Sequence, residues 1–373
     1  MVSPQRGFEP PETGHDSFKS DEVATPYYYG VTLDRYGVRT EVTPTHNCAA
    51  YRFTFSDGEY PDGQDANILI DIAHSIPQHI KPEIGGMFHG GNAVYDAVKR
   101  CISGWGEYSG GFGSGKPYKV YFAVRLDVKP GRVDVASSAD SLLYVQVAFP
   151  DGVDRVHMNI GISMKSVANA ELFLDRETGR RSFDEICAEA KSIWNKTLSA
   201  IEISTEDKDR AKLFYTAFYH SLVMPRDRTG ANPWWGENGT PHFDDHYCVW
   251  DTWRTKYPLM VLLNESFVAR NIESFIDRMT NNGMVKPTFT SALDFEAKQG
   301  GDDVDNVIAD AIIKGVKGFD REKAYNVIRR NAFEDRSPEY LRLGWQPETG
   351  TPMSCSYGVE FAYNDFGVAQ TAL

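Results

Sequence analysis

The sequence predicts a two-domain protein in which an antiparallel β-sandwich precedes an α-helical toroid. The chain has 373 residues, enough at about 100 to 200 residues per domain for two or three domains with their own cores. Residues 27–164 contain short apolar runs of period two or continuous β-branched character, separated by turn residues. From Ser182 onward the apolar period becomes that of a helix.

The first half contains seven runs with the pattern of strands. They are separated by clusters of Gly, Pro, Asp and Asn, such as Ser56-Asp57-Gly58, which indicates an antiparallel sheet domain. The glycine-rich residues 104–115 lack the Lys-Ser or Lys-Thr of a phosphate-binding loop and are interpreted as a hairpin loop. The predicted strands are residues 28–33, 38–45, 50–55, 68–72, 118–126, 142–149 and 157–162.

The second half contains helices joined by long loops. Ser182 and Glu185 form a capping box for a helix, and Ser204 with Asp207 opens another that ends at Pro225. In this layout the helices provide the scaffold, and loops at one end of the ring carry any chemistry. The further helical windows are residues 257–263, 268–278, 304–315, 321–331 and 357–373.

The composition excludes several classes of protein. A net charge of −13 without a basic tract argues against a nucleic-acid partner. No run of about 18 apolar residues predicts a membrane span, and no signal peptide follows Met1. The five cysteines are far apart and form no C-x-x-C pair, which disfavours a zinc site or a disulfide framework.

The densest polar and aromatic stretch is residues 232–254, which ends in W-D-T-W-R. Asp251 and Arg254 can hydrogen-bond vicinal sugar hydroxyls, and the indoles of Trp250 and Trp253 can stack on a pyranose ring. The alternative is structural, with Asp251 at a helix N-terminus paired to Arg254 and flanked by core tryptophans.

A second polar stretch is residues 299–314. Gly300 and Gly301 allow close approach of a ligand or a sharp bend, and Asp302 is the first of three aspartates at the mouth of a helix. The structural alternative is that these carboxylates only complement the helix dipole. The spacing of Asp302, Asp303 and Asp305 faintly resembles that of a calcium-binding loop. The fixed glycine and the terminal glutamate of an EF-hand are missing, however.

Histidines provide little support for a metal site. His242 and His246 have the i, i+4 spacing, but Pro241 and two aspartates near them disfavour a helix there. No G-x-S-x-G nucleophile motif is present. The metal ligands are therefore left unassigned.

Several blocks together resemble glycoside hydrolase family 92, the calcium-dependent exo-acting α-mannosidases. The resemblance runs from about Phe18 to the last residue. In the first half it rests on Y-Y-Y-G-V-T-L at residues 27–33 and Y-R-F-T-F at residues 51–55. In the second half it rests on W-D-T-W-R at residues 250–254, Gly300-Gly301, and E-F-A-Y-N-D-F at residues 360–366.

The resemblance implies an incomplete (α/α)6 toroid and a division of the chain into three parts. Residues 1–165 would form a β-sandwich without its N-terminal strands, residues 166–203 a helical linker, and residues 204–373 the first part of the catalytic domain. The family's general acid and base are expected beyond Leu373, so no catalytic residue is assigned. We expect an internal fragment that is inactive alone.

The resemblance also implies an activity, which is the inverting hydrolysis of terminal α-linked mannose from mannooligosaccharides or N-glycans, of the α-1,2-mannosidase type. Asp251 would accept a mannose hydroxyl, Arg254 would orient Asp251, and Trp250 would shape the pocket wall, with Gly300, Gly301 and Asp302 as weaker candidates. Asp310, Glu360 and Asp365 are expected to serve helix packing and capping.

Ca²⁺ would be the cofactor, with ligands mainly outside this chain. The partners would be α-mannosides or high-mannose glycans. Export to the periplasm or outside the cell is implied as well. The alternative function is a non-catalytic carbohydrate-binding or scaffold protein.

Overall fold

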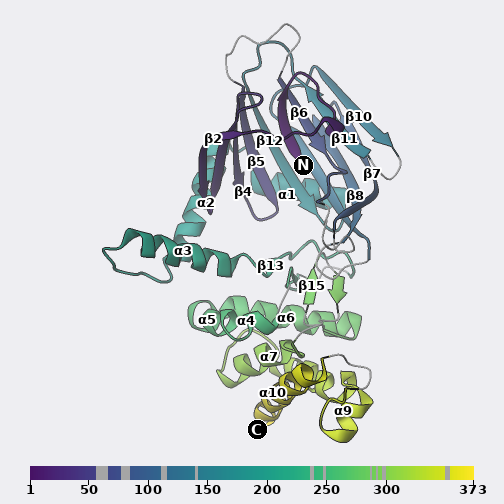
Figure 1. Ribbon diagram of the computed structural model, residues 1–373, viewed down its shortest axis with the longest axis vertical. Coiled ribbons are helices and arrows are strands. Elements are labelled where there is room, and N and C mark those ends of the chain that lie inside the picture. Colours follow the sequence, from purple (N-terminus) through teal and green to yellow (C-terminus); the bar gives the residue numbers. More distant parts are fainter. Residues whose placement is uncertain are drawn as a thin grey trace. The chain divides into compact units, whose positions relative to one another are not determined.

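In the computed structural model the chain forms two compact units, residues Met1–Ser204 and Thr205–Leu373 (Figure 1). The structure describes residues 1–55, 66–76, 85–110, 116–138, 142–235, 239–246, 249–285, 288–290, 293–295, 300–348 and 353–373. The boundary between the units lies at the predicted start of the catalytic domain, residue 204. The stretch expected as a separate linker therefore belongs to the first unit.

The first unit contains two antiparallel sheets. The smaller has the order β1-β6-β11-β10 and the larger β2-β3-β4-β5-β12-β9-β8-β7. The smaller consists of β1 (Val2–Arg6), β6 (Ala66–Asp71), β10 (Arg132–Ser138) and β11 (Leu142–Ala148). The larger consists of β2 (Lys19–Thr25), β3 (Tyr28–Leu33), β4 (Val38–Pro44), β5 (Cys48–Phe55), β7 (Met87–Asp96), β8 (Cys101–Ser109), β9 (Tyr118–Leu126) and β12 (Arg155–Ser163).

One apolar core fills the space between the two sheets. Ile68 and Val145 of the smaller sheet belong to the same buried cluster as Phe53 and Val124 of the larger one. All four side chains are fully enclosed. Burial of this kind contributes about 25 cal/mol per Å² of apolar surface, so this layer stabilises the sandwich. The predicted β-sandwich is confirmed.

Helices cover the other face of the larger sheet. These are α1 (Val167–Phe173), the short π-helical turn η3 (Leu174–Thr178) and α2 (Phe183–Leu198). The predicted capping box is present: Ser182 Oγ accepts from the Glu185 amide, and the Glu185 carboxylate accepts from the Ser182 amide. Within α2, Ile186 near the N-terminus is buried, whereas Ile193 is exposed.

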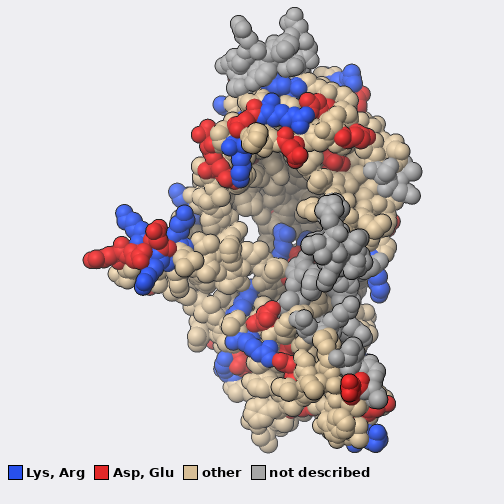
Figure 2. Space-filling model, viewed as in Figure 1, with Lys and Arg blue, Asp and Glu red and all other residues tan. Residues whose placement is uncertain are grey.

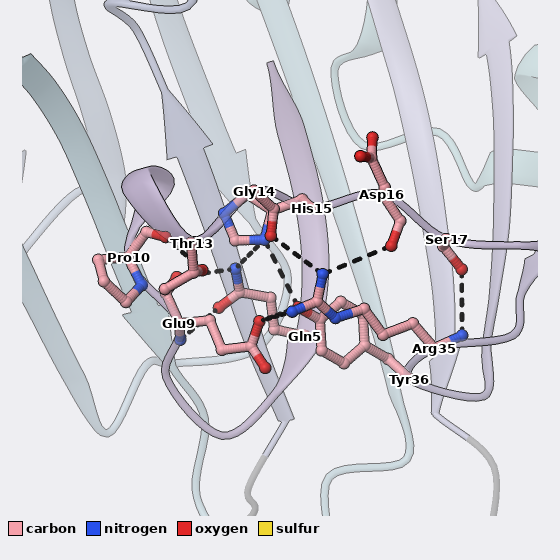
Figure 3. Close-up of polar contacts among 10 residues, drawn as sticks. All are labelled: Gln5, Glu9, Pro10, Thr13, Gly14, His15, Asp16, Ser17, Arg35 and Tyr36. Atoms are coloured by element: carbon pink, nitrogen blue, oxygen red, sulfur yellow. Dashed lines mark hydrogen bonds and ion pairs between the residues drawn. The ribbon is translucent and has the colours of Figure 1, made fainter.

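A polar cluster fixes the segment that passes from β1 to β2 (Figure 3). Gln5 is fully buried in β1. Its Nε2 donates to the Glu9 carbonyl, and its Oε1 accepts from the Glu9 amide. The Glu9 carboxylate accepts from Arg35 at 2.5 Å and from Tyr36 at 2.7 Å. The short helix η1 (Pro11–Thr13) lies within this segment. These contacts tie the start of the chain to the β3–β4 connection.

The second unit is mainly helical. Two antiparallel two-stranded sheets lie between the helices: β13 (Arg226–Asp227) with β14 (Phe243–Asp244), and β15 (Thr288–Thr290) with β16 (Leu293–Phe295). The helices are α3 (Lys208–Leu222), α4 (Val249–Thr252), α5 (Lys256–Leu263), α6 (Glu265–Asn282), α7 (Val304–Ile313), α8 (Arg321–Arg330), the turn η4 (Asn331–Asp335), α9 (Pro338–Leu343) and α10 (Ser354–Ala372).

Some expectations for the first unit were wrong. A strand does precede Phe18, because β1 pairs with β6 from Val2↔Ile70 to Arg6↔Ala66. Strands β2, β7 and β10 were also missed. Gly104 and Gly106 lie within strand β8 rather than in a loop, and an ideal Cβ at Gly104 would collide with the Asn92 carbonyl of β7. Residues 111–115 of that segment lie outside the described residues.

Three further features concern the surface charges, the apolarity of the helices and the cysteines. On the face in Figure 2, acidic and basic side chains are interspersed over the described surface. In the described part of the chain, every helix falls short of the length and apolarity that a bilayer crossing requires. Cys48, Cys101, Cys187 and Cys355 are free thiols, and Cys248 lies outside the described residues.

Candidate functional site

The two polar stretches identified in the sequence meet in the second unit. Gly300 has φ +75°, a left-handed conformation that glycine adopts without strain. A Cβ added there would lie 2.7 Å from the Cβ of Trp250 and 2.8 Å from a carboxylate oxygen of Asp303. Only glycine therefore allows the segment before α7 to pack against the start of α4.

Gly301 lies equally close to helix α10. An ideal Cβ would collide with Asn364 Oδ1 and lie 2.9 Å from the Cβ of Glu360. The next backbone amide, of Asp302, donates to Asn364 Oδ1 at 3.0 Å. Two segments far apart in the sequence, α4 and α10, thus converge on the two glycines.

Arg254 links α4 to α10. Its Nη2 donates to both carboxylate oxygens of Glu360, at 2.6 and 2.8 Å, and its Nη1 donates to the Trp250 carbonyl at 2.6 Å. The prediction that Arg254 orients Asp251 therefore finds no support in these contacts. Glu360, which was expected to serve helix packing and capping, instead anchors a guanidinium.

Asp251 is exposed, and its carboxylate has no partner among the described residues. Its backbone carbonyl accepts from Thr255 Oγ1 at 3.4 Å. The unpaired carboxylate is available to a ligand hydroxyl.

Trp253 is used in packing. Its ring centroid lies 4.9 Å from that of Tyr363, and the Arg254 guanidinium carbon lies 4.4 Å from its ring centre. Its buried Nε1 has no hydrogen-bond partner within the described part of the chain. Trp250, half-buried against Gly300, is the indole placed beside the glycine segment.

Arg336 is a residue that sequence reasoning missed. Its side chain is fully buried and forms ion pairs with Asp302 and, at 3.2 Å, with Asp365. Its guanidinium carbon lies 3.9 Å from the centre of the Phe361 ring. Tyr340 donates to the other oxygen of Asp365 at 2.7 Å. Asp365, expected to cap or pack a helix, thus holds this guanidinium. Arg336 itself was missed because a single arginine after η4 contributes to no periodic sequence pattern.

Two further aspartates of the second stretch are buried. Burial raises the pKa of Asp303 and raises that of Asp305 well above its usual range. Asn306 donates to Asp303 at 3.0 Å, and Asn331 donates to Asp305 at 2.7 Å.

Asp310 of α7, expected to serve helix packing and capping, forms an ion pair at 2.7 Å with Lys314 at the end of that helix.

These carboxylates do not form a calcium site. Asp302, Asp303 and Asp305 are engaged by Arg336 or by amide donors of the protein. In the described ranges, no three side chains of His, Cys, Asp or Glu come together as metal ligands would. The described residues therefore do not fit a Ca²⁺ ion.

The two histidines considered for a metal are buried separately. His246 Nε2 lies 3.3 Å from Asn271 Oδ1 and 3.3 Å from the Tyr257 hydroxyl. Both ring nitrogens of His242 lack partners among the described residues. Burial lowers the pKa of His242 to about 3, so its ring is neutral at pH 7.

Lys256 is a buried cation close to W-D-T-W-R. It is 6% exposed, its ammonium group donates to the Met224 carbonyl, and burial lowers its pKa to about 7. No ion pair forms between it and the other residues that the structure describes.

The chain is similar to one family over nearly all of its length. Residues 3–163 match the glycosyl hydrolase family 92 N-terminal domain, and residues 169–373 match the glycosyl hydrolase family 92 catalytic domain. The match begins at residue 3, earlier than the expected start near Phe18. A relative described as an uncharacterized secreted glycosidase, from Arthroderma benhamiae, is 25% identical over 92% of this chain and 46% of its own.

Solved structures share the fold. The family GH92 alpha-mannosidase BT3965 of Bacteroides thetaiotaomicron has a TM-score of 0.85 and 24% identity, over 100% of this chain and 53% of its own. The inverting mannosidase BT2199 from the same organism has a TM-score of 0.82 and 21% identity, over 100% of this chain and 52% of its own. The chain therefore spans about half the length of these relatives, and its fold is that of a β-sandwich followed by (α/α)6-type helices.

Proposed function

Because the chain belongs to glycosyl hydrolase family 92, we propose that it takes part in the hydrolysis of terminal α-linked mannose from mannooligosaccharides or N-glycans. The observation that carries the proposal is the match to both family domains in order. BT3965 has been solved in complex with mannoimidazole, which supports a mannoside as the ligand. The α-1,2 linkage preference and export from the cell, as in the secreted relative, are part of the proposal.

Asp251 accepts a mannose hydroxyl in the proposed pocket. Its unpaired, exposed carboxylate supports this role, because a charged acceptor binds a hydroxyl more strongly than a neutral one. Trp250 forms the adjacent wall, and Gly300, Gly301 and Asp302 fix that wall at close distance. Arg254 acts by holding the α4 turn to Glu360 rather than by orienting Asp251.

The reaction proceeds with inversion in this proposal. Inversion requires a carboxylic acid that protonates the leaving oxygen and a carboxylate that activates water, about 6.5–9.5 Å apart. No described residue is assigned to either role. Proton NMR of the first product distinguishes the outcomes: β-mannose released from an α-mannoside supports inversion, and α-mannose contradicts it.

Calcium dependence is the second part of the proposal and rests on the family resemblance. In any preparation of the enzyme that hydrolyses mannobiose, a chelator should abolish the activity, and added Ca²⁺ should restore it. Full activity after exhaustive chelation would contradict a calcium requirement.

The binding test uses mannoimidazole and calorimetry on the chain and on Asp251→Asn. The substitution should weaken binding by about 10- to 100-fold, because hydrogen bonds to charged groups contribute about 1.5–3 kcal/mol. Asp310→Asn on α7 is the matched control and should leave binding unchanged. Equal affinities of the chain and Asp251→Asn would refute the assignment of Asp251 to the mannose pocket.

A further inference from the structure

A groove lies between helices α6 and α8 of the second unit, among residues that take no part in the cluster around Arg254 and Arg336. Its volume is about 260 Å³. Pockets for drug-sized ligands begin at about 300 Å³, so this groove suits a ligand of one small ring. The lining residues are Thr240, Glu273, Ile276, Asp277, Thr280, Asp320 and Lys323.

One face of α6 forms a wall of the groove. Glu273, Ile276, Asp277 and Thr280 have the i, i+3, i+4, i+7 spacing that places side chains on the same side of a helix. The buried residues of α6, such as Ile272 and Phe275, lie on its packed side. The groove face is therefore not required for the core.

The polar groups of this wall are partly fixed and partly free. Asp277 accepts from Trp235 Nε1 at 2.5 Å and from Asn281 Nδ2 at 3.0 Å, which holds its carboxylate in place. Glu273 has no hydrogen-bond or ion-pair partner in the described part of the chain. A fixed carboxylate beside a free one provides several acceptors for hydroxyl donors.

Charge argues against an anionic ligand. The lining carries three carboxylates and one ammonium group, and Asp320 already accepts from the Lys323 amide at the start of α8 at 3.0 Å. The helix N-terminus that would attract a phosphate is therefore occupied.

A metal ion is also disfavoured. No three carboxylate or imidazole side chains in the described ranges converge as metal ligands. Carboxylates, threonine hydroxyls and an ammonium group around an aliphatic side chain instead match the alternating hydroxyl and C–H surface of a neutral sugar ring.

We propose that this groove binds one neutral pyranose unit, with Glu273 and Asp277 accepting from its hydroxyls and Lys323 donating to a ring or hydroxyl oxygen. The choice of a pyranose over another neutral polyol rests on the proposed function. The groove would hold a second sugar unit of a glycan on residues that are not assigned to the mannose pocket.

The test uses the chain labelled with 5-fluorotryptophan, followed by fluorine NMR. Its seven tryptophans include Trp235, which is hydrogen-bonded to Asp277, Trp250 of the proposed mannose pocket, and Trp253, which lies three residues after Trp250. The Trp235 signal is assigned with Trp235→Phe, and methyl α-D-mannopyranoside is the probe. We expect a saturable shift of the Trp235 signal.

Variants of one helix provide the control. Glu273→Gln should weaken the sugar affinity read at Trp235 by about tenfold or more, because a charged acceptor is lost. Glu265→Gln, in the first turn of the same helix and outside the groove, should leave it unchanged. Unchanged signals of the other tryptophans in each variant establish that the fold is intact.

Any one of three results would refute sugar binding in the groove. These are the lack of a saturable shift at Trp235, the same sugar affinity in Glu273→Gln as in the parent, and the same shift produced by calcium chloride without sugar. If Trp250 and Trp253 respond and Trp235 does not, the groove fails while the proposed function stands. The reverse pattern would support the groove and count against the mannose pocket.

Discussion

Arg254 donates from a single guanidinium nitrogen to both carboxylate oxygens of Glu360, a residue 106 positions further along the chain. The pair joins α4 to α10 beside the exposed Asp251. Because the Arg254 side chain is 44% exposed and that of Glu360 18% exposed, water screens part of this attraction. The pair therefore has more influence on the geometry of the site than on overall stability.

Arg254→Lys should weaken mannoimidazole binding by about tenfold, or about 1.4 kcal/mol. Lysine keeps the charge but cannot hold Glu360 and the Trp250 carbonyl together. Calorimetry gives the affinity, and urea unfolding should show a loss below about 1 kcal/mol. Arg342→Lys, exposed in α9, should match the parent. A large loss of stability with unchanged affinity would assign the pair a structural role only.

Arg336→Met should lower the free energy of unfolding of the second unit by about 3–5 kcal/mol. Removing one partner leaves Asp302, Asp305 and Asp365 without their shared guanidinium. Urea denaturation measures the change. Adding Asp305→Asn should recover part of it, because the fully buried carboxyl of Asp305 is then gone.

The control for this experiment is Arg342→Met on the exposed side of α9, which should change stability by less than about 0.5 kcal/mol. If Arg336→Met were as stable as the control, the three aspartates would not depend on Arg336.

Lys256→Met should stabilise the protein near pH 7 and flatten its pH dependence between pH 7 and pH 9. The folded-state pKa of Lys256 is lowered to about 7 by burial, whereas the unfolded chain keeps a value near 10.4. Between these values the unfolded state binds more protons, so the stability of the parent rises with pH, by up to about 1.4 kcal/mol per unit.

The measurement is the difference between parent and Lys256→Met in urea unfolding at pH 7, 8 and 9. The gain from the substitution should shrink as pH rises, because the buried lysine becomes neutral in the folded state. A difference that is constant with pH would show that Lys256 titrates alike in both states.

The helical half was predicted well because its signals are local. The capping box of Ser182 and Glu185 and the cap at Asp207 can be read within three or four residues. Every predicted helical window from residue 257 onward coincides with α5, α6, α7, α8 or α10. The missed strands lack this signal: all seven residues of β2 are exposed, and β7 carries Gly90 and Gly91 at its centre.

The candidate site was predicted only in part. Trp250, Gly300, Gly301 and Asp302 do converge, but the partners that hold them were missed. The paired residues are 34 to 106 positions apart in the sequence. Arg336 and Asn364 bind Asp302, and Glu360 binds Arg254. Periodicity and capping report neighbours within a few positions, so such pairs emerge only from tertiary packing.

The contact between Asp302 and Asn364 has a consequence for the order of folding. The two residues are 62 positions apart, and Gly301 lies against the same stretch of α10. Closing a loop of that length costs conformational entropy before any contact is gained, so long-range pairs of this kind tend to form late. The wall beside Trp250 should therefore acquire its final shape only after the last helix has docked, and it should be the first part of the helical unit to open when that helix detaches.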